Sequence, residues 1–172
     1  MPPPLWDFVW KFQISLRKLE YYSNLQGGFF CRILRKYYYH QYKLFSILCG
    51  FSIPINTFGK GLSIAHRGTI VVNSSARIGD NCRLHVGVNI GTVPGCSKAT
   101  PTIGNNCYIG PGAKIYGKIN IADGIIIGAN SVVNKDFNEP NICIAGVPAK
   151  KISNLGSKEM AERNREAYKN YI

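Results

Sequence analysis

The most regular feature of the chain is a branched aliphatic residue at every sixth position. Between residues 103 and 133 these positions hold Ile103, Ile109, Ile115, Ile121, Ile127 and Val133. A small or apolar residue recurs four places after each of the first five: Cys107, Ala113, Ile119, Ile125 and Ser131. A period of six fits neither an α-helix nor a plain alternating strand. It indicates short strands, each followed by a turn.

Three such hexads close one triangular coil of about 18 residues. Successive coils stack at the spacing of hydrogen-bonded strands, about 4.8 Å. The aliphatic residues point inward, whereas Gly, Asn and Asp at the corners accept the positive φ that the turns need. The sequence therefore predicts a mainly β protein built as a parallel β-helix. An ordinary sheet with glycine-rich turns would not keep this phase over five hexads.

The same frame extends towards the N-terminus, with a single interruption. Its inward positions there are Val72, Ile78, Leu84 and Ile90, and the second slot holds Ala76, Cys82 and Val88. After Ile90 the phase breaks, and residues 92–101 read TVPGCSKATP. We interpret this insert as a loop outside the coil, and such insertions often form the binding face of repeat proteins. The β-helix is expected to span residues 52–152.

Residues 1–51 carry no hexads and indicate a helical arm. Apolar residues at helical spacing predict one helix from Trp6 to Tyr22 and a second from Phe29 to Leu48, separated by Gly27 and Gly28. Two interpretations of the arm are compatible with each other. It can cap the open end of the coil stack, whose edge needs protection. It can also lie on an anionic membrane, because it is rich in basic and aromatic side chains.

The remaining segment, residues 153–172, is a polar tail, and we expect an exposed helix from Ser157 to Ile172. The chain carries a formal net charge of +12, which favours an anionic ligand, a membrane surface or a nucleotide-bearing cofactor. It has no arginine-rich tract and no nucleic-acid motif, so a nucleic-acid partner is not expected.

Cysteine usage and hydropathy bear on the compartment. Cys82 and Cys107 occupy the small-residue slot, so we interpret these two as small core residues. No CxxC pair occurs, and this usage of cysteine fits a reducing compartment. No apolar run approaches the length of a membrane span, and the N-terminus lacks the pattern of a signal peptide. We expect a cytoplasmic protein, located at the inner face of the membrane if the arm binds lipid.

The candidate chemistry rests on histidines. Counting back by six from Val72 places His66 in the inward slot, where a buried imidazole would need a polar partner. His85 follows 19 residues later, about one coil, so the two can meet at one edge. Histidine is the natural general base near neutral pH. We therefore interpret His66 as a catalytic base and His85 as an auxiliary catalytic residue. Structural histidines, or a zinc site shared at an interface, are the alternatives; no metal is expected.

Residues 52–152 resemble the hexapeptide-repeat O-acetyltransferases, and within them the serine acetyltransferase branch. The resemblance rests on the segments HRGTIVV, the loop after IGT, PGAKIYG, GANSVV and AGVPAK, which begin at residues 66, 90, 111, 128 and 145. It implies a left-handed β-helix and a homotrimer with active sites between subunits. It also implies direct attack of a hydroxyl, deprotonated by His66, on acetyl-CoA in a ternary complex. Backbone amides would stabilise the developing oxyanion.

The resemblance further implies where acetyl-CoA binds. Its pantetheine arm would run along the C-terminal coils over small residues, and polar or basic residues would face its phosphates. The matching positions are Gly110, Ala113, Gly128, Ala129, Ser131, Asn134, Lys135 and Lys150. Turn geometry alone is the alternative explanation for the glycines.

Two departures from the family pattern affect the expected acceptor. Serine acetyltransferases carry an Asp before the catalytic His and a second His in the loop, where this chain has Ala65 and Thr100. Another group must then orient His66, and Glu20 or a backbone carbonyl is the candidate. We expect a sugar or polysaccharide-precursor acceptor, as in the variants associated with surface polysaccharide synthesis. L-Serine is the alternative acceptor, and a non-catalytic β-helix scaffold is the alternative of another class.

Overall fold

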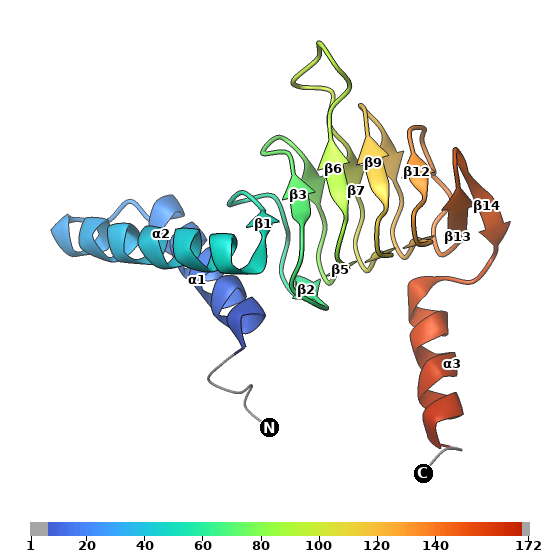
Figure 1. Ribbon diagram of the computed structural model, residues 1–172, viewed down its shortest axis with the longest axis horizontal. Coiled ribbons are helices and arrows are strands. Elements are labelled where there is room, and N and C mark those ends of the chain that lie inside the picture. Colours follow the sequence, from blue (N-terminus) through green and yellow to red (C-terminus); the bar gives the residue numbers. More distant parts are fainter. Residues whose placement is uncertain (1–6, 170–172) are drawn as a thin grey trace.

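The computed structural model describes residues 7–169, and side chains up to residue 166 (Figure 1). The chain begins with two helices, α1 (Phe8–Asn24) and α2 (Phe29–Cys49), and its last described element is α3 (Ser157–Lys169). The predicted helix start at Trp6 and the predicted end of the tail at residues 170–172 lie outside the described residues. The helical arm and the short C-terminal helix are confirmed.

Between the helices, short strands wind around three faces. Sheet A consists of β1 (Phe51–Ser52), β3 (Ile70–Val72), β6 (Asn89–Gly91), β9 (Lys114–Tyr116) and β12 (Val132–Val133). Sheet B consists of β4 (Arg77–Ile78), β7 (Thr102–Ile103) and β10 (Asn120–Ile121). Sheet C consists of β2 (Ser63–Ile64), β5 (Arg83–Leu84), β8 (Tyr108–Ile109), β11 (Ile126–Ile127), β13 (Cys143–Gly146) and β14 (Ala149–Ser153). All pairings are parallel except that of β13 with β14.

The strand register reproduces the six-residue frame. Ile109 pairs with Ile127, and Ile115 pairs with Val133, each 18 residues apart, which is one full coil. These four residues are completely buried and form part of an aliphatic column along the axis. The small-residue slot forms a second buried column that includes Ala76, Cys82, Val88, Cys107, Ala113, Ile125 and Ser131. The predicted parallel β-helix is therefore confirmed.

The structure contradicts the placement of His66 in the inward column. Ile64 fills that slot instead, because it pairs with Leu84, 20 residues later rather than 18. The corner between β2 and β3 is therefore two residues longer than a regular corner. His66 lies in this longer corner with its side chain exposed to solvent. The frame breaks locally, and no buried imidazole has to be accommodated.

The helical arm packs against the first coil. Phe12 is fully buried and meets the ring of Phe51 edge to face, with the centroids 5.0 Å apart. The Tyr42 hydroxyl donates to the Ile53 carbonyl at 2.8 Å, and the Arg17 guanidinium donates to the Phe58 carbonyl at 3.0 Å. These contacts cover backbone groups and aliphatic surface at the N-terminal end of the stack.

The insert and the C-terminal helix leave the coil on different sides (Figure 1). Residues 92–101 form a loop between β6 and β7. At the base of this loop, the Thr100 hydroxyl donates to the Ser75 carbonyl at 3.0 Å. At the first residue of α3, the Ser157 N–H donates a hydrogen bond to the Gly124 carbonyl at 3.0 Å. Figure 1 shows the loop at the top of the coil and α3 extending below it.

The aliphatic column is open to a direct stability test. Replacing Ile115 by Ala removes fully buried methyl groups and leaves a cavity, so we expect a loss of about 2–5 kcal/mol in the free energy of unfolding. Val71→Ala, on the outward side of another strand of sheet A, is the matched control and should change stability by no more than about 0.5 kcal/mol. Urea unfolding measures both. Equal losses in the two variants would contradict the inward and outward assignment.

Candidate active site

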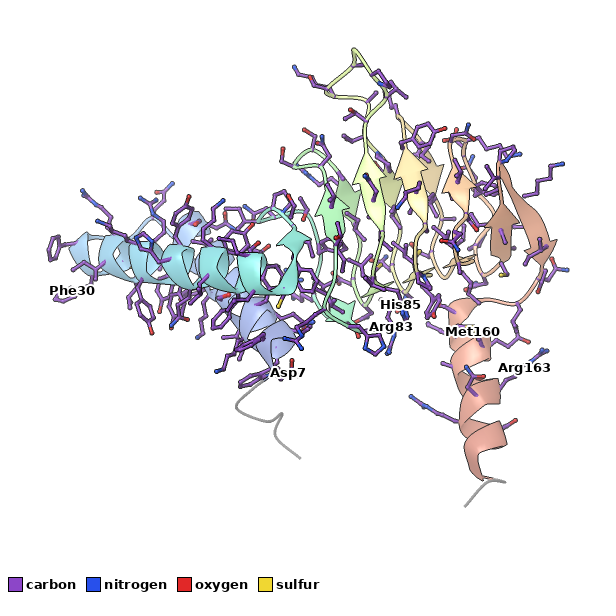
Figure 2. The ribbon with its side chains drawn as sticks, in the orientation of Figure 1. Asp7, Phe30, Arg83, His85, Met160 and Arg163 are labelled. Carbon is purple, nitrogen blue, oxygen red and sulfur yellow. The ribbon has the colours of Figure 1, made fainter. Side chains whose placement is uncertain are left out.

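Two histidines and a tyrosine gather along one edge of sheet C. The register aligns β2, β5 and β8, so that Arg83 lies beside Tyr108, and His85 follows Leu84 immediately. The His85 ring lies 4.9 Å from the Tyr108 ring and 6.5 Å from the His66 ring, measured between centroids. Figure 2 shows Arg83 and His85 on the lower side of the coil, towards α3. The structure thus brings the two predicted histidines together.

The environment of His85 keeps its imidazole neutral. Its Nε2 atom is buried and has no hydrogen-bond partner within residues 7–169. Burial, together with the nearby Arg83 guanidinium and His66, lowers the pKa of His85 below its ordinary value. A neutral imidazole with a free ring nitrogen can accept or donate one hydrogen bond to a ligand.

His66 is held by a backbone corner that is anchored on both sides. The Ala65 N–H donates to the Leu84 carbonyl at 3.0 Å, and the Gly68 N–H donates to the Cys49 carbonyl at 2.9 Å. Glu20, one candidate for orienting His66, is engaged elsewhere. Its carboxylate accepts from Arg17 at 2.8 Å and from the Asn56 N–H, between β1 and β2, at 2.7 Å. Glu20 therefore does not orient His66.

A pocket of about 430 Å³ opens beside His85, between sheet C and α3. Sheet C contributes its outward side chains and α3 contributes the opposite wall; the lining includes Arg83, His85, Tyr108, Met160 and Asn164. Among the described residues that line it, none is a carboxylate. The pocket offers hydrogen-bond donors, cations and an aromatic face. This composition suits a neutral or anionic hydroxyl compound better than a cation.

The sequence did not single out Arg83 and Tyr108 as site residues. Both occupy the outward position directly before the aliphatic residue of their hexad, and both belong to the same face as His85. Once His85 is assigned to sheet C, the register alone predicts that these two side chains are its neighbours.

The corner that carries His85 continues towards the C-terminal coils. The His85 N–H donates to the Ile109 carbonyl, the Gly110 N–H to Ile127 and the Gly128 N–H to Ile144. Lys150 lies one strand further, because it pairs with Ala145 across the β13–β14 hairpin. His85, Gly110, Gly128, Ala145 and Lys150 are therefore successive positions along one corner, and Ala129 is exposed beside them.

The other residues proposed for cofactor binding lie elsewhere. Ala113 and Ser131 are fully buried in the second column, so they offer no surface to a ligand on the outside of the coil. Asn134 and Lys135 are exposed, but they follow β12. They therefore lie at the opposite end of this sheet A strand from Gly128 and Ala129. The Lys135 ammonium lies 5.5 Å from the Phe137 ring. The structure thus divides the predicted set between two corners and the interior.

Coil stacking already requires glycine at two of these positions. A Cβ at Gly110 would lie 2.7 Å from the Ile127 carbonyl oxygen, and a Cβ at Gly128 would lie 2.8 Å from the Ala145 Cβ. Both distances are shorter than a normal contact. These glycines therefore carry no separate signal for a cofactor. The features that fit acetyl-CoA are the small exposed corner at Ala129 and the exposed side chains of Lys135 and Lys150, whose cations suit phosphates.

No three His, Cys, Asp or Glu side chains among residues 7–169 gather as metal ligands. All six cysteines are free thiols.

With this geometry in place, comparisons with known proteins identify the class of fold. Residues 100–135 match the family described as bacterial transferase hexapeptide (six repeats). The crystal structure of serine acetyltransferase from Brucella abortus strain S19 superimposes with a TM-score of 0.69 at 27% identity, covering 84% of this chain and 57% of that chain. Residues 100–135 therefore carry the hexapeptide repeat, and the coil is the left-handed parallel β-helix that the resemblance implied.

Other relatives that match the chain are also named serine acetyltransferase. A serine acetyltransferase of Synechococcus elongatus is 37% identical over 113 residues, which are 64% of this chain and 46% of the relative. Soybean serine acetyltransferase complexed with serine has a TM-score of 0.71 at 25% identity, covering 86% of this chain and 58% of that one. The chain thus spans about half the length of the relatives it matches.

The state of His85 predicts a pH dependence of stability. A pKa lowered by folding means that the unfolded chain binds the proton more readily below about pH 6.5. The contribution of neutral His85 is therefore complete above that pH and is lost as the pH falls. His85→Gln, which cannot titrate, should lose less stability than the natural protein between about pH 7 and pH 5. Urea unfolding across this range measures the effect. Parallel losses in both proteins would contradict the lowered pKa.

Proposed function

We propose that this protein is an O-acetyltransferase that moves an acetyl group from acetyl-CoA to a hydroxyl, with His66 as the general base. The observation that carries the proposal is the histidine corner of sheet C, where the exposed His66 lies beside His85, and His85 lines a ligand-sized pocket. The hexapeptide repeat and the similarity to serine acetyltransferases support the reaction class.

His66 is well placed for proton transfer, because its imidazole is exposed and its backbone is fixed by two hydrogen bonds. It would accept the proton of the acceptor hydroxyl while that oxygen attacks, and it would then return the proton to the departing thiolate. Acetyl-CoA supplies the acetyl group as a reactive thioester. Neutral His85 and Tyr108 would hold the acceptor by hydrogen bonding and ring contact.

The corner from His85 to Lys150 is the proposed path of acetyl-CoA. Gly110, Gly128 and Ala145 follow His85 at intervals of one coil, and Lys150 lies one strand beyond Ala145, so four steps of about 4.8 Å lead from His85 to Lys150. Because Gly110, Gly128 and Ala129 have no side chain or a small one, the cofactor could lie close to the backbone along this path. Lys150 would meet a phosphate at its far end. A structure of the Brucella abortus relative is described as a complex with coenzyme A, with a TM-score of 0.65 to this chain. Asn134 and Lys135 lie at the other corner, and a role for them would place part of the cofactor there.

Two acceptors remain, and different observations favour them. The names of the relatives favour L-serine. The site favours a sugar hydroxyl, since the described lining of the pocket offers no carboxylate for an ammonium group and Ala65 replaces the family aspartate. We keep serine O-acetyl transfer as the first candidate and a sugar or polysaccharide precursor as the second.

The proposed assembly is a homotrimer. In one chain the loop of residues 92–101 and the histidine corner lie on different sides of the coil (Figures 1 and 2). The resemblance implies active sites between subunits, and such an arrangement would bring the loop of one chain to the histidines of another. Light scattering on the purified protein measures the mass of the assembly.

His66→Ala provides the decisive test of the mechanism. Removing a general base should lower acetyl transfer by about 10²–10⁴-fold. His40→Ala, which removes an exposed histidine on α2, is the matched control and should leave the rate unchanged. Thiol release from acetyl-CoA measures turnover, and circular dichroism confirms that both variants fold. Undiminished activity of His66→Ala would rule out its role as the base.

The acceptor is tested by supplying L-serine beside a panel of sugars and nucleotide sugars. Thiol release with L-serine alone would establish the first candidate and show that Ala65 and Thr100 are tolerated. Release with a sugar alone would establish the second. A non-catalytic scaffold predicts no binding of acetyl-CoA, so a thermal shift by the cofactor distinguishes it from both.

A further inference from the structure

The helical arm presents a large apolar surface to solvent. On α2 the exposed apolar side chains include Phe29, Phe30, Ile33, Tyr37, Leu44 and Ile47, which we call the α2 face. Phe30 is 79% exposed, Ile47 78% and Phe29 70%. At about 100° per residue, these six positions fall within a sector of about 100°. A helix in a soluble monomer seldom leaves such a stripe uncovered.

The stripe continues along the whole of α2, from its N-terminal to its C-terminal turn (Figure 2, where Phe30 marks the free end). The opposite side of the helix packs on α1 through Tyr38 and Tyr42, whose rings meet Tyr22 and Phe12. The α2 face is therefore not part of the interior of the arm.

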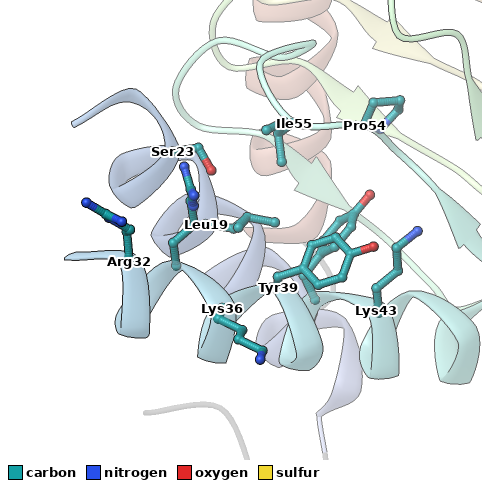
Figure 3. A pocket seen from close by; sticks show the side chains of 10 residues that line it. Leu19, Ser23, Arg32, Lys36, Tyr39, Lys43, Pro54 and Ile55 are labelled. Atoms are coloured by element: carbon teal, nitrogen blue, oxygen red, sulfur yellow. The ribbon is translucent and has the colours of Figure 1, made fainter. Parts of the chain in front are cut away.

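Lysines border the α2 face on both sides. Lys36 and Lys43, both labelled in Figure 3, lie next to Phe29 and Ile47 on the helical wheel, along one edge of the face. On the other edge the Lys11 ammonium lies 6.0 Å from the ring of Phe45. The basic residues that form ion pairs within the described residues are Arg17, Lys151 and Arg163. No ion pair there therefore neutralises Lys11, Lys36 or Lys43.

The balance of charge favours a lipid surface over a second copy of the chain. The arm carries seven basic and two acidic side chains: Lys11, Arg17, Lys18, Arg32, Arg35, Lys36, Lys43, Asp7 and Glu20. Asp7 caps α1 by accepting from the Trp10 N–H, and Glu20 is paired with Arg17. Two α2 faces brought together would therefore set like charges against each other without free carboxylates between them.

We propose that the α2 face docks this protein on an anionic bilayer, with its aromatic and aliphatic side chains among the acyl chains and its flanking lysines on phosphate headgroups. An amphipathic helix with this arrangement lies in the plane of the interface. Within residues 7–169, no helix is long and apolar enough to cross a membrane. The proposal does not depend on the acceptor or on catalysis.

Docking would also bring the histidine corner close to the bilayer. The Arg67 guanidinium, next to His66, lies 5.8 Å from the Phe8 ring at the start of α1. Phe8 in turn stacks on Phe45, beside one edge of the α2 face, with the centroids 6.2 Å apart. A continuous set of contacts therefore joins the proposed lipid surface to the candidate base.

Flotation of the full chain with vesicles tests the proposal. The protein should float with vesicles of phosphatidylcholine and phosphatidylglycerol, much less with phosphatidylcholine alone, and less as salt is added. Lys36→Glu/Lys43→Glu should weaken binding by about a hundredfold or more, since each reversal replaces an attraction by a repulsion. Phe29→Ser/Ile47→Ser should weaken it by at least about tenfold.

Matched controls lie outside the helical arm. Val147→Ser/Ile152→Ser removes two comparably exposed apolar residues, and Lys98→Glu/Lys118→Glu reverses two exposed charges outside the arm. Both should bind vesicles nearly as well as the natural chain. The proposal fails if anionic vesicles do not capture the protein, or if arm and control variants lose binding equally. It also fails if Phe29→Ser/Ile47→Ser dissociates an assembly in lipid-free solution, because the face would then be a protein interface.

Discussion

The stacking of one coil on the next is the constraint on which the rest of the structure depends. Each aliphatic residue must lie above its counterpart, as Ile109 lies beside Ile127, while the backbone of each coil bonds to the next. This register fixes the outward residues as strictly as the inward ones, since side chains alternate along a strand. Arg83, His85 and Tyr108 become neighbours for this reason, although Tyr108 is more than twenty residues from the other two.

The candidate site lies where the repeat departs from regularity. A corner of regular length has little room for a projecting side chain, as the close approach of the next coil to Gly110 shows. The corner between β2 and β3 is two residues longer, and the extra length carries His66 outward while Ile64 keeps the interior column intact. Ile64 therefore contributes to stability, whereas His66 is available for the proposed chemistry. His66 can be replaced without opening the core.

The sequence predicted the fold well because a six-residue period has few structural interpretations. It placed the interior columns, the loop and the helices, and it brought His66 and His85 to neighbouring coils. It placed His66 inside the column, because counting by six cannot detect two additional residues in a corner whose flanking positions are also apolar. It also grouped Asn134 with Lys150, since small and basic residues recur at every corner and only the strand register distinguishes one corner from another.

The two departures from the serine acetyltransferase pattern have different structural consequences. Ala65 directly precedes His66, so the missing aspartate changes the immediate surroundings of the base in the same chain. Thr100 lies at the base of the loop, where its hydroxyl binds Ser75, on the side of the coil away from His85. Within one chain the loop follows sheet A, whereas the histidine corner follows sheet C, so a subunit contact would be needed to bring the two together. If the chain forms the proposed trimer, the choice of acceptor is therefore a property of two subunits, and Ala65 and Thr100 would act on it from opposite sides of one interface.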